Sequence, residues 1–284
     1  MRKKVIALAM IAAMVVSLTA CGGKNNDKQG KDSTESLKVA YQSGIAYAPI
    51  LVMKDQKLIE KNYDGNVDID WQLLSGGAAI SEGLTSNTVD VGAIGTGVAI
   101  TGAKAGAPYK IFAGMSSQPY RISTNKEEIK TLKDITKEDQ IAITGINSQP
   151  HIVLAMAAKA YLGDAHALDA NLVAQPNADG YTSLVSGAVQ CHMIMSPYCF
   201  MEQNKEGIHQ IEVDESVWPV GDTTIVGVAT DKLKEERPKL YEAVCKAMDE
   251  AIEFINDNPE KTADILKDYY DASQEEIVSW LTND

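Results

Sequence analysis

Residues 141–151 read Ile141-Ala142-Ile143-Thr144-Gly145-Ile146-Asn147-Ser148-Gln149-Pro150-His151, and an apolar-rich run continues to Tyr161. The short β-branched run predicts a strand that stops at Gly145. Pro150 suits the first turn of a helix, because the N–H that proline lacks has no intrahelical partner there. The stretch therefore predicts a strand, a tight loop and a helix whose free N–H groups favour an anionic or strongly polar ligand. An ordinary capped helix explains the same residues, so a function needs partners elsewhere in the chain.

Three strand–loop–helix units precede this stretch. Strands are expected over residues 37–41, 67–74 and 89–94, and helices over residues 47–60, 78–86 and 98–105. Because strands alternate with helices, we expect the strands to pair in parallel.

The same order of elements recurs about one hundred residues later. Strands are expected over residues 141–144, 171–174 and 190–195, with helices to Tyr161 and over 179–186. Similar residues align across the offset: Leu84 with Leu184, Ser86 with Ser186, Val89 with Val189, Thr96 with Ser196 and Gly77 with Asn177. The shared order of elements, more than these identities, predicts two similar lobes.

The chain is expected to cross between the lobes twice, near residues 116–121 and near residues 219–223. A buried strand over residues 224–229 then returns it to the first lobe. Amphipathic helices are expected over residues 233–256, 259–270 and 273–281.

The N-terminus predicts an export signal over residues 1–20. Met1-Arg2-Lys3-Lys4 is followed by an apolar run, Val5 to Leu18, that is too short for a permanent membrane span. Leu18-Thr19-Ala20-Cys21 resembles the lipobox of bacterial lipoproteins, which implies lipidation of Cys21; an ordinary signal with a free Cys21 is the alternative. Gly22 to Ser36 contains no hydrophobic residue, so residues 21–36 are expected to form a flexible tether.

Charge and cysteines exclude several functions. The formal net charge of −13 becomes −16 once Arg2, Lys3 and Lys4 are lost with the signal, which makes nucleic acid an unsuitable partner. Beyond Cys21 the cysteines are Cys191, Cys199 and Cys245, none with C-x-x-C spacing, so no disulfide framework is indicated. A metal site at Cys191-His192 and Cys199 lacks a fourth ligand, and buried thiols are favoured.

The loops after the strands are the predicted ligand site, because ligands of parallel α/β sheets bind outside the carboxyl ends of the strands. If the lobes face one another, these loops converge on one cleft. The candidate ligand-binding residues are Ser43, Gly44, Tyr47, Ser75, Gly76, Gly77 and Thr96 in the first lobe, and Asn147, Ser148, Gln149, His151, Asn177, Ser196 and Tyr198 in the second. For each residue alone, helix capping is the competing explanation.

Arginine is the expected clamp for a carboxylate or sulfonate, and the chain beyond the signal has only two. Arg237 lies in an acidic run that looks like protein surface. Arg121 follows the first crossing, where it either reaches the cleft or faces solvent. The cleft is therefore expected to be rich in neutral donors, which suits a small sulfonate-type anion or a heteroaromatic ring.

At this point the sequence resembles a known family, the type II extracellular solute-binding proteins of ABC importers, in the branch for nitrate, taurine, alkanesulfonates and thiamine-pyrimidine precursors. The resemblance covers about residues 37–281. It is carried by the order and spacing of Ala46-Tyr47-Ala48-Pro49, Gly83-Leu84-Thr85-Ser86, Val89-Asp90-Val91-Gly92, Leu132-Lys133-Asp134-Ile135, Leu184-Val185-Ser186-Gly187-Ala188-Val189 and Phe254-Ile255-Asn256-Asp257-Asn258-Pro259-Glu260.

The resemblance implies a two-lobed α/β fold of the periplasmic-binding-protein type II, with the lobes joined by two crossing strands and the ligand cleft between them. Residues 37–118 and 222–284 are expected to form the first lobe, and residues 119–221 the second. Relatives usually continue for some tens of residues past the position of Leu281, so the first lobe is expected to be truncated.

The implied function is an extracytoplasmic receptor, anchored to the membrane by lipid on Cys21, that passes a small solute to importer permease subunits. We expect a monomer without cofactor, metal or catalytic activity. Two alternatives remain. One is an enzyme, since a pyrimidine-precursor synthase in yeasts has a similar fold, although its cysteine-rich motif is missing here. The other is an adhesive or structural surface lipoprotein without a ligand.

Overall fold

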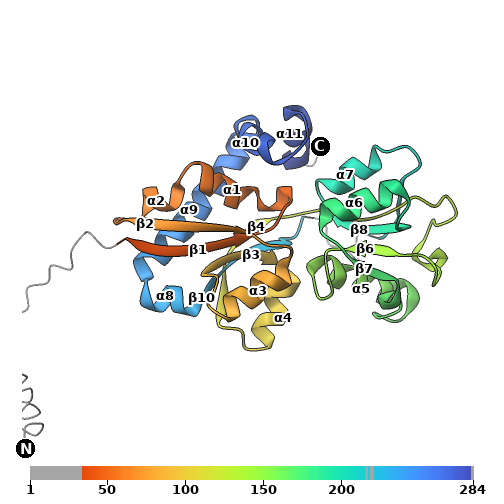
Figure 1. Ribbon diagram of the computed structural model, residues 1–284, viewed down its shortest axis with the longest axis horizontal. Helices are drawn as coiled ribbons and strands as arrows, with labels where there is room; N and C mark the ends of the chain where they lie inside the picture. The colour runs from red at the N-terminus through yellow and green to blue at the C-terminus, as the bar shows by residue number, and fades with distance from the viewer. Residues whose placement is uncertain (1–33, 215–216, 218–220, 283–284) are drawn as a thin grey trace, which may run out of the picture. The chain divides into compact units, whose positions relative to one another are not determined.

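The computed structural model describes residues 34–214, 217 and 221–282. The predicted signal at residues 1–20, Cys21 and most of the predicted tether lie outside these residues. None of the described helices is long and apolar enough to cross a membrane. Two five-stranded sheets, each with its own helices, make up the described part of the chain (Figure 1).

The first sheet has the strand order β2-β1-β3-β10-β4. The strands are β1 (Glu35–Tyr41), β2 (Val67–Leu73), β3 (Val91–Gly95), β4 (Tyr109–Ser116) and β10 (Ile225–Thr230). Parallel pairing holds for β1 with β2 and with β3, whereas β10 runs antiparallel to β3 and β4. The predicted parallel pairing of the first three strands is confirmed. Strand β10 is antiparallel because the chain enters it from the second lobe and not through a crossover helix.

Helices cover both faces of this sheet. They are α1 (Ala48–Asp55), α2 (Leu58–Asn62), α3 (Gly77–Thr85), α4 (Thr96–Lys104), α8 (Asp231–Glu236) and α9 (Pro238–Asp257). Figure 1 shows α1, α2 and α9 on one face of the sheet, with α3 and α4 on the other. The amphipathic α9 buries a stripe of apolar residues at helical spacing, among them Leu240, Val244 and Met248, in the main core of the molecule.

The second sheet has the order β7-β6-β8-β5-β9. Its strands are β5 (Tyr120–Thr124), β6 (Ile141–Ile143), β7 (Leu172–Ala174), β8 (Cys191–Met195) and β9 (His209–Ile211), and its helices are α5 (Gln149–Leu162), α6 (Asn177–Ser186) and α7 (Tyr198–Gln203). As in the first sheet, the three strands linked by helices pair in parallel, while β5 and β9 form antiparallel pairs.

The structure confirms the repeat predicted from the sequence. Helix α3 begins at Gly77 and α6 at Asn177, while β3 begins at Val91 and β8 at Cys191. The orders β2-β1-β3-β10 and β7-β6-β8-β5 are also equivalent. The two-lobed α/β fold class is therefore correct.

Two predicted helices are in fact interrupted. The helix expected over residues 47–60 divides into α1 and α2 because Lys57 adopts a left-handed conformation, with φ of 54°. The helix expected over 233–256 divides at Arg237, since Pro238 disfavours helical geometry in the preceding residue and opens a new helix instead. Strand β4 was not predicted, and β1 begins at Glu35, inside the residues assigned to the tether.

Arg237 is not the free surface residue that its acidic neighbours suggested. Its guanidinium lies 2.6 Å from Asp90 Oδ1 and also donates to the backbone carbonyl of Ser36. Asp90 in turn accepts from the backbone N–H of Lys38 at 2.9 Å. Both charged side chains are less than a quarter exposed, at 22% and 18%. This network joins the break between α8 and α9 to the start of β1.

We therefore expect Arg237→Ala to lower the free energy of unfolding by about 1.5–3 kcal/mol, the usual contribution of a partly buried hydrogen bond to a charged group. Urea titration followed by circular dichroism measures the change. Lys232→Ala, on the exposed side of α8, is the matched control and should change stability by less than about 0.5 kcal/mol. Equal effects of the two substitutions would contradict a structural role for Arg237.

The chain crosses between the lobes twice, as expected. The first crossing joins β4 to β5 through residues 117–119, and the second joins β9 to β10. They meet where the backbone N–H of Thr224 donates to the carbonyl of Ser116 at 2.9 Å. The second crossing also contacts the start of α4, where Thr96 donates its N–H to Thr224 O and its hydroxyl to Thr223 O, both at 2.9 Å.

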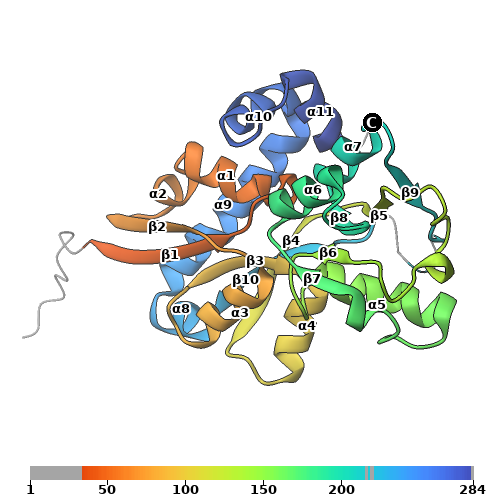
Figure 2. The same ribbon diagram turned by 45° about the vertical axis from the view of Figure 1, so that its right-hand side comes forward.

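The last described elements are α10 (Pro259–Leu266) and α11 (Gln274–Thr282), which pack together beside α9 (Figure 2). The ring of Tyr270 meets that of Trp280 edge to face, with centroids 5.9 Å apart. Trp280 is only 6% exposed. This aromatic pair holds α11 against the first lobe, close to α7 of the second.

Candidate functional site

A cleft of about 230 Å³ lies between the lobes, at the carboxyl ends of β1, β2 and β7. It is lined by Gln42, Ser43, Leu73, Leu74 and Ser75 from the first lobe and by Pro176, Asn177 and Ala178 from the second. All of these side chains are neutral. Its volume is below the range of about 300–1,000 Å³ that is typical of pockets for drug-sized molecules, so it suits a small solute.

Two helix N-termini at this edge have no side-chain cap. Helix α3 follows Gly76 and α6 follows Pro176, and neither residue accepts a hydrogen bond from the first turn through a side chain. The first N–H groups of a helix have no intrahelical acceptor and carry partial positive charge. The cleft therefore offers donors for acceptor atoms of a ligand even though it has no cationic side chain in its lining.

Two buried polar side chains from the second lobe have no hydrogen-bond partner. Asn177, at the start of α6, is 9% exposed and its Oδ1 atom is unpaired. Ser196, after β8, is fully buried and its Oγ atom is unpaired. Gln175 Oε1 is a third such atom in the same set of loops. Unpaired polar atoms are costly to bury, so each of these three atoms can form a hydrogen bond with a ligand or with water.

Tyrosines form the wall beside these loops. Burial raises the pKa of Tyr198, and a hydrogen bond with Ser43 of the other lobe opposes that rise. The rings of Tyr198 and Tyr181 lie 5.9 Å apart. Burial also raises the pKa of Tyr270, while the Gly44 backbone N–H opposes the rise by hydrogen bonding to its hydroxyl. Tyr47 is 1% exposed, so it belongs to the core of the first lobe.

The loop at residues 145–148, which the sequence analysis took as its starting point, forms most of its hydrogen bonds with the first turn of α5. Ser148 caps α5 by accepting from the His151 N–H at 3.4 Å. His151 Nδ1 accepts from the Asn147 N–H at 3.0 Å, and its Nε2 lies 3.4 Å from Asp169. Asn147 is exposed, with φ of 62°. The side chains of Ser148 and His151 thus hold the start of α5 in place.

The remaining candidates are distributed around the cleft. Ser43, Ser75 and Asn177 line it, and Gly76 and Gly77 open α3 beside it. Gly44, with φ of 135°, approaches the carbonyl of Ser196. Thr96 turns its hydroxyl to the second crossing, and Gln149 reaches across to Gly97. Arg121 donates to its neighbour's carbonyl, Tyr120 O, at 2.9 Å and is not in the cleft lining.

Residues that the sequence did not mark as candidates also line the cleft or its wall. Gln42 directly follows β1 and precedes Ser43, so its position at a strand end was an available signal. Leu73 is 60% exposed at the end of β2, and an exposed leucine cannot be recognised from a strand pattern alone. Tyr270 lies far along the chain and reaches the wall only through the packing of α10 and α11.

The three cysteines in the described part of the chain are free thiols: Cys191 and Cys199 are buried and Cys245 is half-buried. Burial raises the pKa of Cys191 to about 11 and that of Cys199 to about 12. His192, next to Cys191, bonds through Nδ1 to Glu202 Oε1 at 2.5 Å, and both side chains are almost wholly buried. No group of three or more metal-binding side chains lies together among the described residues.

Comparison with protein families identifies a match over residues 30–267, to a family described as NMT1-like. The chain belongs to the NMT1-like family. No curated protein sequence matches this NMT1-like chain.

Solved structures similar to this NMT1-like chain share its fold at low sequence identity. The periplasmic aliphatic sulphonate-binding protein SsuA from Escherichia coli is 21% identical, with a TM-score of 0.66 over 88% of this chain and 84% of that one. The alkanesulfonate-binding protein SsuA from Xanthomonas axonopodis pv. citri, bound to MOPS, is 17% identical, with a TM-score of 0.69 over 87% and 83%. The periplasmic nitrate-binding protein NrtA from Synechocystis PCC 6803 is 17% identical, with a TM-score of 0.68 over 87% and 70%.

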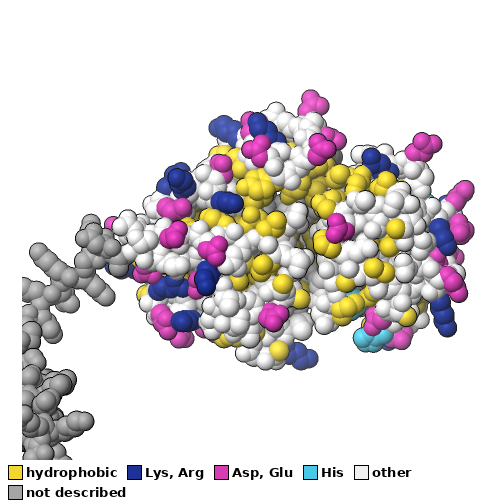
Figure 3. Space-filling model, in the orientation of Figure 1, with side chains coloured by type: hydrophobic (Ala, Val, Ile, Leu, Met, Phe, Trp, Pro, Cys, Tyr) yellow, Lys and Arg dark blue, Asp and Glu magenta, His cyan; other side chains and the backbone are white. Residues whose placement is uncertain are grey.

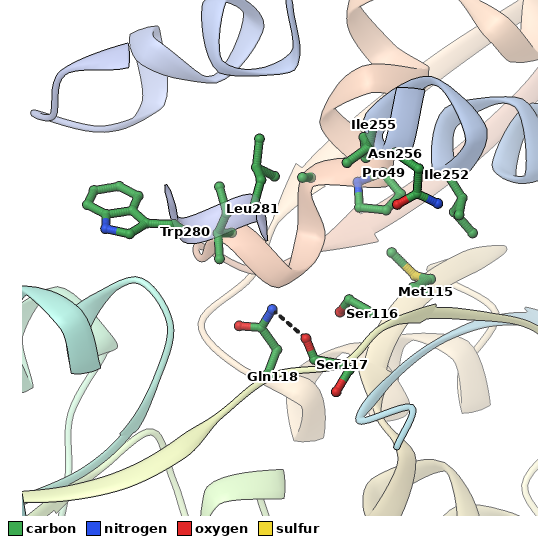
Figure 4. A pocket seen from close by; sticks show the side chains of 12 residues that line it. Pro49, Met115, Ser116, Ser117, Gln118, Ile252, Ile255, Asn256, Trp280 and Leu281 are labelled. Atoms are coloured by element: carbon green, nitrogen blue, oxygen red, sulfur yellow. Dashed lines mark hydrogen bonds between the residues drawn. The ribbon is translucent and has the colours of Figure 1, made fainter. Parts of the chain in front are cut away.

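A second pocket of this NMT1-like chain, about 180 Å³ in volume, lies beside the first crossing and not between the strand-end loops. Figure 4 shows Gln118 projecting from the crossing segment below Trp280 and Leu281, with the Ile252, Ile255 and Asn256 side chains of α9 across the pocket. Gln118 is 8% exposed and its Oε1 atom is unpaired. The pocket adjoins the hinge, but its lining comes almost entirely from the first lobe and the crossing and not from the loops of both lobes.

The surface shown in Figure 3 has hydrophobic side chains gathered where the two lobes meet below α10 and α11. Acidic and basic side chains lie mostly toward the outer edges of that face. The centre of this face of the NMT1-like chain is therefore largely uncharged, in keeping with the neutral lining of the cleft.

Proposed function

We propose that the chain is an extracytoplasmic solute receptor, anchored by lipid on Cys21, that captures a small solute by lobe closure and delivers it to the permease of an ABC importer. The observation that supports this most is the cleft between the lobes. Its lining combines neutral residues of both lobes with uncapped helix N-termini, and unpaired buried polar atoms lie in the loops beside it. The similar proteins from E. coli, X. axonopodis and Synechocystis are described as binding sulfonates or nitrate.

The solute that we propose is a small anion of the sulfonate, nitrate or taurine type. The N–H groups at the starts of α3 and α6 favour acceptor atoms and negative charge, and these helices have nine and ten residues, long enough for a terminal dipole. At the same edge, the Ser196 hydroxyl and the Asn177 amide nitrogen can donate to an anion, whereas the unpaired Asn177 Oδ1 only accepts and suits an N–H donor such as the ammonium group of taurine. The absence of Lys and Arg from the cleft lining fits an anion bound by backbone N–H groups. A pyrimidine-type heterocycle is the alternative solute.

Thermal unfolding of the purified chain with nitrate, ethanesulfonate, taurine and an aminopyrimidine tests this proposal. A solute at one hundred times its dissociation constant stabilises the folded state by about 2.7 kcal/mol, which raises the midpoint by several degrees. A rise with any of the first three supports an anion receptor, and a rise with the aminopyrimidine alone supports the heterocycle. No rise with any of them, in a chain that folds, would contradict the proposal.

For the solute that stabilises the chain, Asn177→Ala is expected to weaken binding about ten- to hundredfold, because a hydrogen bond to a charged group contributes about 1.5–3 kcal/mol. Isothermal titration calorimetry measures the change. Thr182→Ala is the matched control on the same helix, since its exposed hydroxyl bonds only to Ala178 O. An unchanged affinity of the Asn177 variant would place the solute outside this cleft.

A further inference from the structure

The two lobes meet directly at the starts of α4 and α5. Gln149, the first residue of α5, projects its side chain to the first lobe, where Oε1 accepts from the backbone N–H of Gly97 at 2.6 Å. Gly97 is the second residue of α4, so its N–H has no acceptor within its own helix. A side chain of the second lobe thus occupies the donor that a ligand or a capping residue would otherwise use.

Two glycines make this approach possible. A Cβ atom on Gly95 would lie 2.3 Å from Gln149 Cβ, and a Cβ on Gly97 would lie 2.8 Å from both Gln149 Oε1 and Ile152 Cδ1. Neither glycine has a positive φ. Their backbone conformations therefore do not require glycine. Glycine is required because a side chain at either position would collide with Gln149 or Ile152 of the other lobe.

An apolar contact adjoins this hydrogen bond. Ile152 lies three residues after Gln149, on the same side of α5. Its side chain packs against the hydrophobic cluster of the first lobe that contains Ile94 and Val98. We call this the Gln149 contact: it joins Gln149 and Ile152 of the second lobe to Gly95 and Gly97 of the first. It combines a hydrogen bond between neutral groups with the burial of apolar surface.

We propose that the Gln149 contact stabilises the closed arrangement of the two lobes around a solute, so that Gln149 is a positioning residue and not a ligand contact. The sequence had suggested the opposite role, that of a ligand-binding residue. The geometry favours closure because the Gln149 side chain fills the space at the start of α4 and leaves the cleft at β1, β2 and β7 for a solute. The inference gives the proposed receptor a mechanism of closure, but it does not depend on which solute binds.

Amide hydrogen exchange at Gly97 tests the proposal in the chain saturated with the solute that gives the largest thermal shift, with the solute-free chain as the comparison. In the purified full chain, labelled with ¹⁵N and followed by NMR, we expect the Gly97 N–H to exchange at least about tenfold more slowly than an unprotected amide. Gln149→Ala should remove that protection, whereas Gln149→Glu should keep it, because a carboxylate also accepts and is favoured at a helix N-terminus. Met156→Ala, an exposed position on the same helix, is the control and should leave exchange at Gly97 unchanged.

Small-angle X-ray scattering supplies a second measurement. Gln149→Ala should increase the radius of gyration of the chain measured with that solute while circular dichroism stays unchanged, since the residue lies between the lobes and not in either core. Fast exchange at Gly97 in the parent chain, or the same exchange after Gln149→Ala, would overturn the proposal. No thermal response to any solute would refute the receptor function, whereas a solute that binds without slowing exchange at Gly97 would overturn the role of the Gln149 contact alone.

Discussion

Gly95→Ala is expected to keep the lobes apart and to weaken solute binding by roughly five- to 150-fold, the range that corresponds to about 1–3 kcal/mol of overpacking. The added methyl group would lie 2.3 Å from Gln149 Cβ and 2.7 Å from both Gln149 Cγ and Oε1. Gly95 has φ of −63° and ψ of 142°, which alanine adopts readily. The first lobe should therefore fold normally, and the cost should fall on closure.

Three measurements check this expectation: the radius of gyration, the exchange of the Gly97 amide, and the affinity for the solute that gives the largest thermal shift. Ile100→Ala is the control, because Ile100 is 59% exposed on the same helix α4. Gly95→Ala should affect all three measurements and Ile100→Ala none. A compact, tightly binding Gly95 variant would show that the lobes close without bringing Gln149 against Gly95.

Glu202→Ala is expected to lower the free energy of unfolding by about 3–5 kcal/mol, the effect of removing one partner of a buried pair. Glu202 Oε1 lies 2.5 Å from His192 Nδ1, and the side chains are 0% and 1% exposed. The pair fixes α7 to β8, because Glu202 lies on α7 and His192 lies in β8. Its loss would leave an imidazole without its partner inside the second lobe.

Thermal and urea unfolding measure this effect, and the melting temperature should fall by roughly 6–20 °C. Glu206→Ala, which removes an exposed carboxylate a few residues further on, is the like-for-like control. Gly180→Ala tests the same site from α6, since its Cβ would lie 2.5 Å from His192 Nε2. A Glu202 variant as stable as the Glu206 variant would mean that the pair contributes nothing to the second lobe.

The parts of the fold that occur in both lobes could be predicted from the repeat in the sequence. The hundred-residue offset in the sequence predicts that α6 is equivalent to α3 and β8 to β3, because hydrophobic periodicity indicates which face of an element is buried. Breaks within helices were harder to predict. Lysine has no preference for the left-handed conformation that Lys57 adopts, so the residue type did not predict this break. The break at Arg237 was indicated only by Pro238.

The site was predictable in position but less so in the role of each residue. Ser43, Ser75 and Asn177 line the cleft as strand-end loops should. Ser148 and His151 are also polar residues at a strand-end loop. Their hydrogen bonds, however, are made within α5 and its N-terminal loop and with Asp169. Sequence patterns give the loop in which a side chain lies, whereas the direction in which the side chain points depends on packing across the chain. For the same reason Tyr270 was missed as part of the cleft wall.

The hydrogen bonds between Thr96 and the second crossing have a mechanical consequence. Thr96 is bonded to Thr223 and Thr224, and it lies between Gly95 and Gly97. Any rotation of the crossing segments must therefore carry the first turn of α4 with it, and with that turn the donor that Gln149 occupies. Hinge rotation and separation of the lobes at Gln149 are in this way parts of one movement, so opening should follow a single relaxation rate and not two.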